Sequence, residues 1–88
     1  MRQDRLVRLL RSVAANVRRV RLTAQLTQEQ LAEAADIDLN SLRRIETART
    51  NPSIGTLLCV SDALGVELSE LLTPAVLAKP RRGRPSKT

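Results

Sequence analysis

The chain contains no Phe, Trp, Tyr or His, and it has a single Cys among its 88 residues. One cysteine excludes an internal disulfide, and without histidine neither a Cys-His nucleophile pair nor the usual zinc site is available. We therefore expect no enzyme activity, no metal and no cofactor. A core without aromatic side chains must be built from Leu, Val, Ile and Ala, which favours an all-α fold of closely packed helices.

No apolar run approaches the roughly 18 residues that a membrane-spanning helix needs, and the Arg-rich start lacks the apolar stretch of a signal peptide. The sequence therefore predicts a cytoplasmic protein. A chain of 88 residues provides one small domain. A core of this size is marginal, and small domains often gain stability by forming oligomers.

The formal net charge of +6 is distributed unevenly along the chain. Residues 1–21 hold seven Arg and one Asp, residues 22–78 hold three Arg and eight acids, and residues 79–88 hold five basic groups. Basic ends of this kind suggest contacts with phosphates. Single-stranded nucleic acid is usually bound through aromatic stacking, so duplex DNA is the favoured partner.

The stretch from Thr27 to Glu46 has the pattern of two short helices joined by a tight turn. Thr27 and Gln30 can form a capping box at the start of the first helix, and Asp38 can cap the second. The second helix has a single buried pair, Leu42 and Ile45, so it must lie at the surface. We predict a helix-turn-helix.

Opposite that buried pair, the second helix should present a polar face, because each residue turns the helix by about 100°. This face comprises Leu39, Asn40, Arg43, Arg44 and Thr47. In the major groove, Arg can bond to guanine, Asn to adenine, and an exposed Leu can contact a thymine methyl. Considered alone, the same pattern also fits an ordinary solvated helix face.

Several motifs shift the balance because they occur together in one order. They are TQEQLA, Ile37, Leu42-x-x-Ile45-Glu46, NPSIGTLL and ALGVELSELL. From about Val13 to Leu72 the chain resembles the Cro and phage-repressor helix-turn-helix family, the xenobiotic-response-element class. The resemblance implies a compact five-helix repressor-like domain. It also implies that Arg21 pairs with Glu46 and so ties the first helix to the recognition helix.

The chain departs from the family pattern at two turns. Asp36 stands where the family usually has glycine, at a position that tends to the left-handed backbone region. Ala48 falls where glycine is also common, so the end of the recognition helix is expected to differ.

The resemblance implies a homodimer that places the recognition helices, about residues 38–47, in successive major grooves of a palindromic operator. The expected base contacts are Leu39, Asn40, Arg43 and Arg44. The expected phosphate contacts are Thr27, Gln28, Ser41, Arg49 and Asn51. The expected dimer interface comprises Leu72, Val76 and Leu77. The alternative is that leucines of this segment close the monomer core, above all Leu68 and Leu71.

Periodicity locates the remaining helices. A long first helix from about Gln3 to Thr23 carries an apolar stripe of Leu6, Leu10, Val13, Val17 and Val20. Pro52 ends a loop, Ser53 caps a fourth helix and Gly65 ends it in the left-handed region. The apolar side of the fourth helix centres on Leu57, flanked by Ile54, Val60, Ser61 and Leu64, and Cys59 points outward.

We expect two parts, a DNA-binding and dimerisation domain over residues 1–78 and a disordered basic tail over residues 79–88. Within the tail, Arg82-Gly83-Arg84-Pro85 resembles the core of an AT-hook, which lies in the narrow minor groove of A·T-rich DNA. Nonspecific attraction to phosphates is the alternative.

The sequence thus predicts a sequence-specific double-stranded DNA-binding transcription regulator that acts as a homodimer and associates with the nucleoid. The alternative is an antitoxin-type module that neutralises a protein partner and uses its helix-turn-helix for autoregulation.

Overall fold

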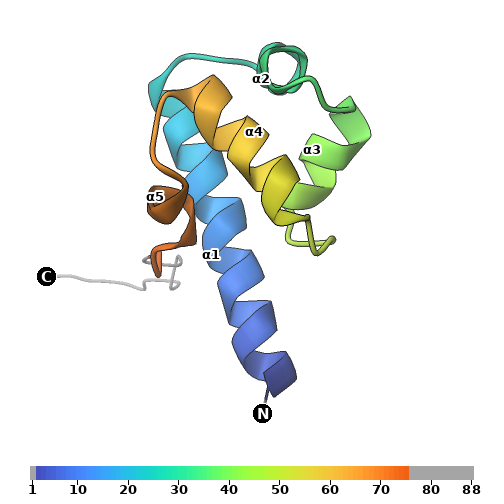
Figure 1. The fold of residues 1–88 in the computed structure, drawn as a ribbon, viewed down its shortest axis with the longest axis vertical. Helices are drawn as coiled ribbons and strands as arrows, with labels where there is room; N and C mark the ends of the chain where they lie inside the picture. Colours follow the sequence, from blue (N-terminus) through green and yellow to red (C-terminus); the bar gives the residue numbers. More distant parts are fainter. Residues whose placement is uncertain (1, 76–88) are drawn as a thin grey trace, which may run out of the picture.

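The computed structural model describes residues 2–75, which form five α-helices and no strand. The helices are α1 (Arg2–Thr23), α2 (Gln28–Ala35), α3 (Leu39–Glu46), α4 (Ile54–Leu64) and α5 (Leu68–Leu72). The long helix α1 packs against α3 on one side and α5 on the other, while α2 and α4 pack against each other and complete the domain (Figure 1). The expected all-α, five-helix fold is confirmed.

Local hydrogen bonds begin and end the helices as the sequence predicts. Thr27 Oγ1 accepts from the backbone N–H of Gln30 at 3.0 Å, and Gln30 Oε1 accepts from that of Thr27 at 2.9 Å, completing the capping box. The side chains of Asp38 and Ser53 likewise accept a backbone N–H three residues on. Gly65 ends α4 with φ at 74°.

The core is entirely aliphatic, and α1 reaches it only with the C-terminal half of its length. Its buried cluster comprises Val13, Val17, Leu31, Ala32, Ala35, Leu42, Ile45, Leu57, Val60 and Leu71. Leu71 is fully buried, which agrees with the alternative that this leucine closes the core of the monomer. No helix within residues 2–75 is long and apolar enough to cross a membrane.

The apolar side predicted for α4 is correct for Leu57, Val60 and Ser61, which are buried, but wrong for Ile54. Ile54 is exposed because it lies about 70° from the centre of the buried side, in the first turn of the helix. Leu58 is exposed next to it, one turn further along α4. Cys59 is exposed, as predicted.

A buried amide joins α5 to α1. Asn16 Nδ2 donates to the carbonyl oxygens of Leu71 at 3.0 Å and Thr73 at 2.8 Å. One turn earlier on α1, Ser12 Oγ accepts from the backbone N–H of Ala75 at 3.2 Å. These bonds hold residues 71–75 along α1.

Three non-glycine residues end helices in the left-handed region. Gln25 has φ at 61°, and Asp36 and Ala48 have φ at 58°; in each case the next residue's N–H bonds five residues back, which is a Schellman motif. Asp tolerates this region better than most residues, whereas Ala does not. The expectation that the end of the recognition helix differs is therefore wrong, because α3 ends in the glycine-type conformation although residue 48 is alanine.

Replacing Ala48 with glycine is expected to raise the free energy of unfolding by about 0.5 to 1 kcal/mol, because the relieved backbone strain exceeds the added chain entropy. Urea unfolding followed by circular dichroism measures the change. Ala34→Gly in the exposed part of α2 is the matched control, and it should destabilise by about 1 kcal/mol. Equal destabilisation by both substitutions would contradict the assigned strain.

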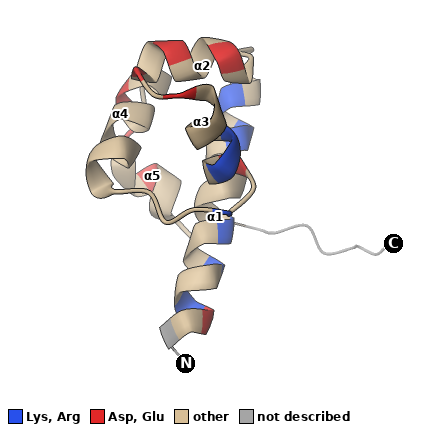
Figure 2. Cartoon of the chain, turned by 90° about the vertical axis from the view of Figure 1, so that its right-hand side faces the viewer, with Lys and Arg blue, Asp and Glu red and all other residues tan. Residues whose placement is uncertain are grey.

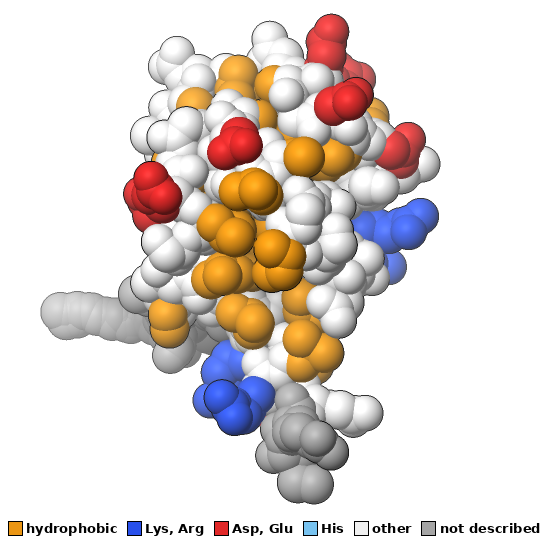
Figure 3. All heavy atoms as spheres, viewed as in Figure 1, with side chains coloured by type: hydrophobic (Ala, Val, Ile, Leu, Met, Phe, Trp, Pro, Cys, Tyr) orange, Lys and Arg blue, Asp and Glu red, His pale blue; other side chains and the backbone are white. Residues whose placement is uncertain are grey.

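Charges are segregated along the molecule. Arginines recur along α1 and stand at the end of α3, whereas acidic residues gather on α2 and on the turn that leads into α3 (Figure 2). The half of α1 that extends past the other helices therefore carries positive charge. Figure 3 shows that hydrophobic side chains are also exposed over this half and over α4.

Candidate nucleic-acid interface

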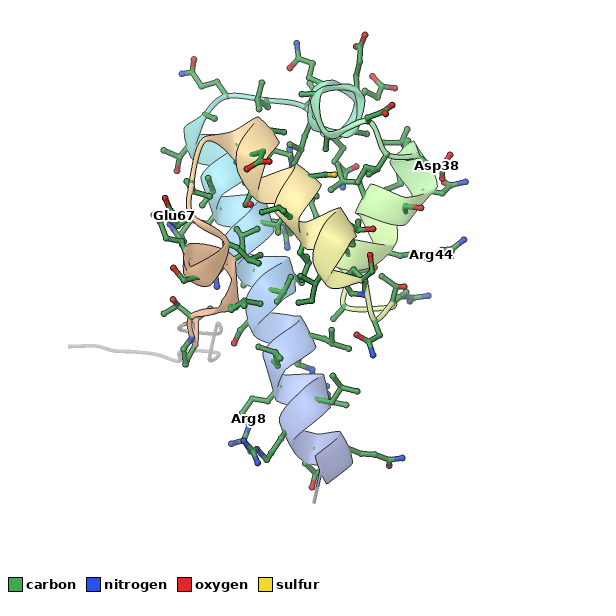
Figure 4. All side chains as sticks on the ribbon, viewed as in Figure 1. Arg8, Asp38, Arg44 and Glu67 are labelled. Carbon is green, nitrogen blue, oxygen red and sulfur yellow. The ribbon has the colours of Figure 1, made fainter. Side chains whose placement is uncertain are left out.

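The outer face of α3 is polar and exposed to solvent. Leu42, Ile45 and Glu46 are buried, whereas Asn40, Arg43 and Arg44 are exposed. Within residues 2–75, the side chains of the latter three make no hydrogen bond or ion pair. Figure 4 shows Arg44 and the capping residue Asp38 projecting from the same side of the molecule, away from the body. Two guanidinium groups and an amide are thus presented on one helix.

The predicted position of Leu39 on the outward face of α3 is wrong. Leu39 is half-buried and packs against the core together with Ile37. The reason is its place in the first turn of α3, where the chain arrives from the turn that follows α2. Only part of its side chain is available for a contact with a base.

A buried ion pair fixes α3 on α1, as the resemblance implies. Arg21 Nε lies 2.7 Å from Glu46 Oε2, and the Arg21 terminal nitrogen lies 3.0 Å from Glu46 Oε1. The two side chains are only 11% and 1% exposed. A further Arg21 nitrogen donates to the Leu26 carbonyl at 2.9 Å, in the loop before α2. This two-point contact sets the orientation of the polar face.

Gln28 is a third member of this contact, which the sequence does not predict. Gln28 Nε2 donates to Glu46 Oε1 at 3.0 Å, so Glu46 receives bonds from both α1 and α2. An amide group has two N–H donors. Gln28 can therefore hold Glu46 and still offer a second hydrogen to a phosphate. Nothing in the local sequence signals this bond, because the two residues are 18 positions apart.

Three of the expected contact residues come together at the end of α3. A hollow of about 250 Å³ lies between α3, the loop that follows it and the start of α4. It is lined by Ser41, Arg44, Ile45, Thr50, Asn51, Pro52, Ser53 and Thr56. The lining is mostly polar, carries one guanidinium and adjoins a helix N-terminus, which favours an anion. The sequence does not predict that Thr50, Ser53 and Thr56 line this hollow. The predicted N-cap at Ser53 is the one signal in the sequence that points to it.

The other expected phosphate contacts do not line this hollow. Arg49 is exposed in the loop after α3, and Thr27 is exposed at the start of α2. The Thr27 hydroxyl oxygen accepts a bond within the capping box, which leaves its hydrogen available as a donor. The residues expected in the tail and in part of the dimer interface lie outside the described residues. These are Val76, Leu77, Arg82, Gly83, Arg84 and Pro85.

Comparisons with known proteins identify the family of the chain. The family model described as helix-turn-helix matches residues 17–71. The immunity repressor protein of Bacillus phage phi105 is 38% identical over 68 residues, which cover 77% of this chain and 47% of the repressor. An uncharacterized HTH-type transcriptional regulator of Sinorhizobium fredii is 37% identical over 62 residues, which cover 70% and 80% of the two chains. The chain spans about half the length of the phage repressor.

Solved structures of regulators are similar in fold. A hypothetical transcription factor from Neisseria superposes with a TM-score of 0.73 at 30% identity, over 75% of this chain and 76% of that one. The restriction-modification controller protein C.AhdI from Aeromonas hydrophila gives 0.69 at 29% identity, over 70% and 94%. The chain therefore belongs to the Cro and phage-repressor type of helix-turn-helix family, whose members are DNA-binding transcription regulators and not enzymes.

Proposed function

We propose that the protein is a sequence-specific regulator that binds a palindromic operator as a homodimer, with α3 of each copy in the major groove. The observation that carries the proposal is that Asn40, Arg43 and Arg44 are exposed and have no side-chain partner within residues 2–75, on a helix fixed by a buried ion pair. These side chains are expected to read base edges, with Leu39 adding an apolar contact from its exposed part.

Phosphates on either side of the groove are the proposed partners of the surrounding residues. The hollow that contains Ser41 and Asn51 receives one phosphate next to the start of α4, and Arg49 contacts the backbone from the loop. At the start of α2, Thr27 and Gln28 each retain an N–H or O–H donor for a second phosphate. Two anchor points on opposite sides of α3 would fix its register along the groove.

Dimerisation is proposed at the end of the domain that carries α5. Leu72 is half-buried, and it lines a hollow with Leu9 of α1 and Pro74. An apolar side chain of a second copy can fill such a hollow. The relatives described above are a repressor, a controller and transcription regulators, and none of them favours the antitoxin alternative.

Selection of bound sequences from random duplexes tests the proposed function. We expect enrichment of two inverted half-sites whose centres lie about 34 Å apart, one turn of the duplex. Enrichment of a single half-site would contradict the homodimer but not the readout. Recovery of no preferred sequence would contradict sequence-specific binding itself.

The basic segment from Lys79 to Thr88 is proposed to add minor-groove contacts through Arg82-Gly83-Arg84-Pro85. Deleting residues 79–88 should weaken binding and reduce the slope of log Kd against log salt by up to about 0.9 for each of the five charges that contacts phosphate. Binding isotherms at several salt concentrations, on operators with A·T-rich or G·C-rich flanks, measure both effects. If full-length and truncated proteins rank the flanks alike, the segment acts only as an electrostatic anchor.

A further inference from the structure

The N-terminal half of α1 carries an apolar stripe that nothing within residues 2–75 covers. Leu6 and Leu9 are 40% and 42% exposed, although Leu6 lies on the same side of α1 as the buried Val13 and Val17. The family match begins at residue 17, so this half of α1 precedes the shared domain. An apolar stripe that continues beyond the core of its own chain is available to another chain.

A second apolar stripe lies on α4. Ile54 is 64% exposed and Leu58 is 48% exposed, and the exposed Asp62 follows at the same four-residue spacing. Figure 3 shows one continuous band of hydrophobic side chains that runs from α4 down to the projecting half of α1. The two stripes therefore form a single surface, which we name the α1–α4 band.

The two ends of the α1–α4 band carry opposite charge. Acidic side chains surround its α4 end and arginines stand at its α1 end (Figure 3). Arg5 and Arg8 line a hollow of about 230 Å³ together with Leu9 and Leu72. A partner that fits this end must bring an apolar side chain with a carboxylate beside it, and Leu58 with Asp62 on α4 has this chemistry.

We propose that the α1–α4 band binds the α1–α4 band of a second copy in antiparallel orientation. The projecting half of α1 then packs on α4 of the partner subunit, and Arg5, which lines the hollow beside Leu9, faces the carboxylate of Asp62 across the interface. This arrangement names the surface of the homodimer in the proposed function and rests on it. Each contact occurs twice because the interface is related by a twofold axis.

The symmetry also agrees with binding to one duplex. A twofold axis that lies horizontally in the plane of Figure 3 exchanges the upper and lower ends of the band, so that opposite charges meet. The same axis leaves α3 of both copies on one side of the dimer. Arg8 projects on the side opposite Arg44 in Figure 4, so it is not placed to contact the same DNA.

Charge reversal across the interface tests the proposal by sedimentation equilibrium of the full chain without DNA. Asp62→Arg and Arg5→Glu should each raise the Kd of dimerisation about tenfold, because each places like charges together. The double variant should return the Kd to within about threefold of the original, since the attraction is restored with its sign exchanged. Arg18→Glu, an exposed change elsewhere on α1, is the control and should leave the Kd unchanged.

Apolar contacts are tested in the same way. Leu58→Glu should yield a folded monomer, whereas Leu22→Glu should not affect the Kd, because Leu22 is 57% exposed on the opposite side of α1. Circular dichroism confirms that each variant is folded. A dimer that Leu58→Glu and the reversals leave intact would overturn the α1–α4 band while leaving the homodimer in place. A wild-type chain that is monomeric at high micromolar concentration would overturn both the homodimer and the α1–α4 band. Sequence-specific DNA binding would still be tested separately, by the selection of bound sequences.

Discussion

Replacing Arg21 with methionine should lower the free energy of unfolding by about 3 to 5 kcal/mol, because it leaves the carboxylate of Glu46 buried without its charged partner. The Glu46 side chain is 1% exposed, so water cannot take the place of the guanidinium. Gln28 would then supply the remaining side-chain bond to Glu46. A single amide N–H does not compensate a buried negative charge.

Urea unfolding of Arg21→Met, Glu46→Met and the double variant separates the pair from its surroundings. The double variant should be considerably more stable than the sum of the single losses predicts, because no charge is left buried. Arg18→Met is the matched control on the exposed side of α1 and should change the stability by no more than about 0.5 kcal/mol. A loss below about 1 kcal/mol in both single variants would contradict the assigned role of the pair.

The readout residues should have the second large effect. Arg43→Ala and Arg44→Ala are each expected to cost about 1 to 3 kcal/mol of binding to the selected operator if the contact is bidentate to guanine. Each substitution should also relax the base preference at one position of the half-site. Neither guanidinium has a partner within the described residues, so their removal should leave the fold intact.

Arg49→Ala provides the control for readout. As a proposed phosphate contact, it should weaken binding about equally on all sequences and lower the salt slope by about 1. Isotherms on the selected operator and on single-base variants measure both classes of effect. An unchanged base preference in both Arg43→Ala and Arg44→Ala would remove these residues from the readout and leave Asn40 as its main candidate.

The features that were predictable from the sequence are those set by residues close together in the chain. The capping box at Thr27, the cap at Asp38 and the left-handed end at Gly65 all involve partners within four residues. The helical period likewise identified the buried pair of α3. Arg21 and Glu46 are 25 residues apart in sequence, and only the family resemblance indicates their contact.

The features that were missed depend on which surfaces meet in space. Periodicity located an apolar side on α4 but did not show that Ile54 lies at its uncovered edge, nor that Leu58 is exposed. The half-burial of Leu39 depends on the path of the preceding turn. The bond of Gln28 to Glu46 requires the packing angle of α2 against α3, which no local pattern specifies.

The bonds of Asn16 and Ser12 to residues 71–75 fix the point on the domain from which the rest of the chain continues. They hold Ala75 on α1, and α5 lies on the side of that helix opposite α3 (Figure 1). Six residues lie between Ala75 and Arg82, and the seven residue-to-residue steps of a fully extended chain span at most about 25 Å. The position at which Arg82-Gly83-Arg84 can meet DNA is therefore limited by this radius. For the proposed minor-groove contact, the number of residues after Ala75 therefore matters as well as the affinity of the motif, because it sets the effective concentration of the motif at a flanking site.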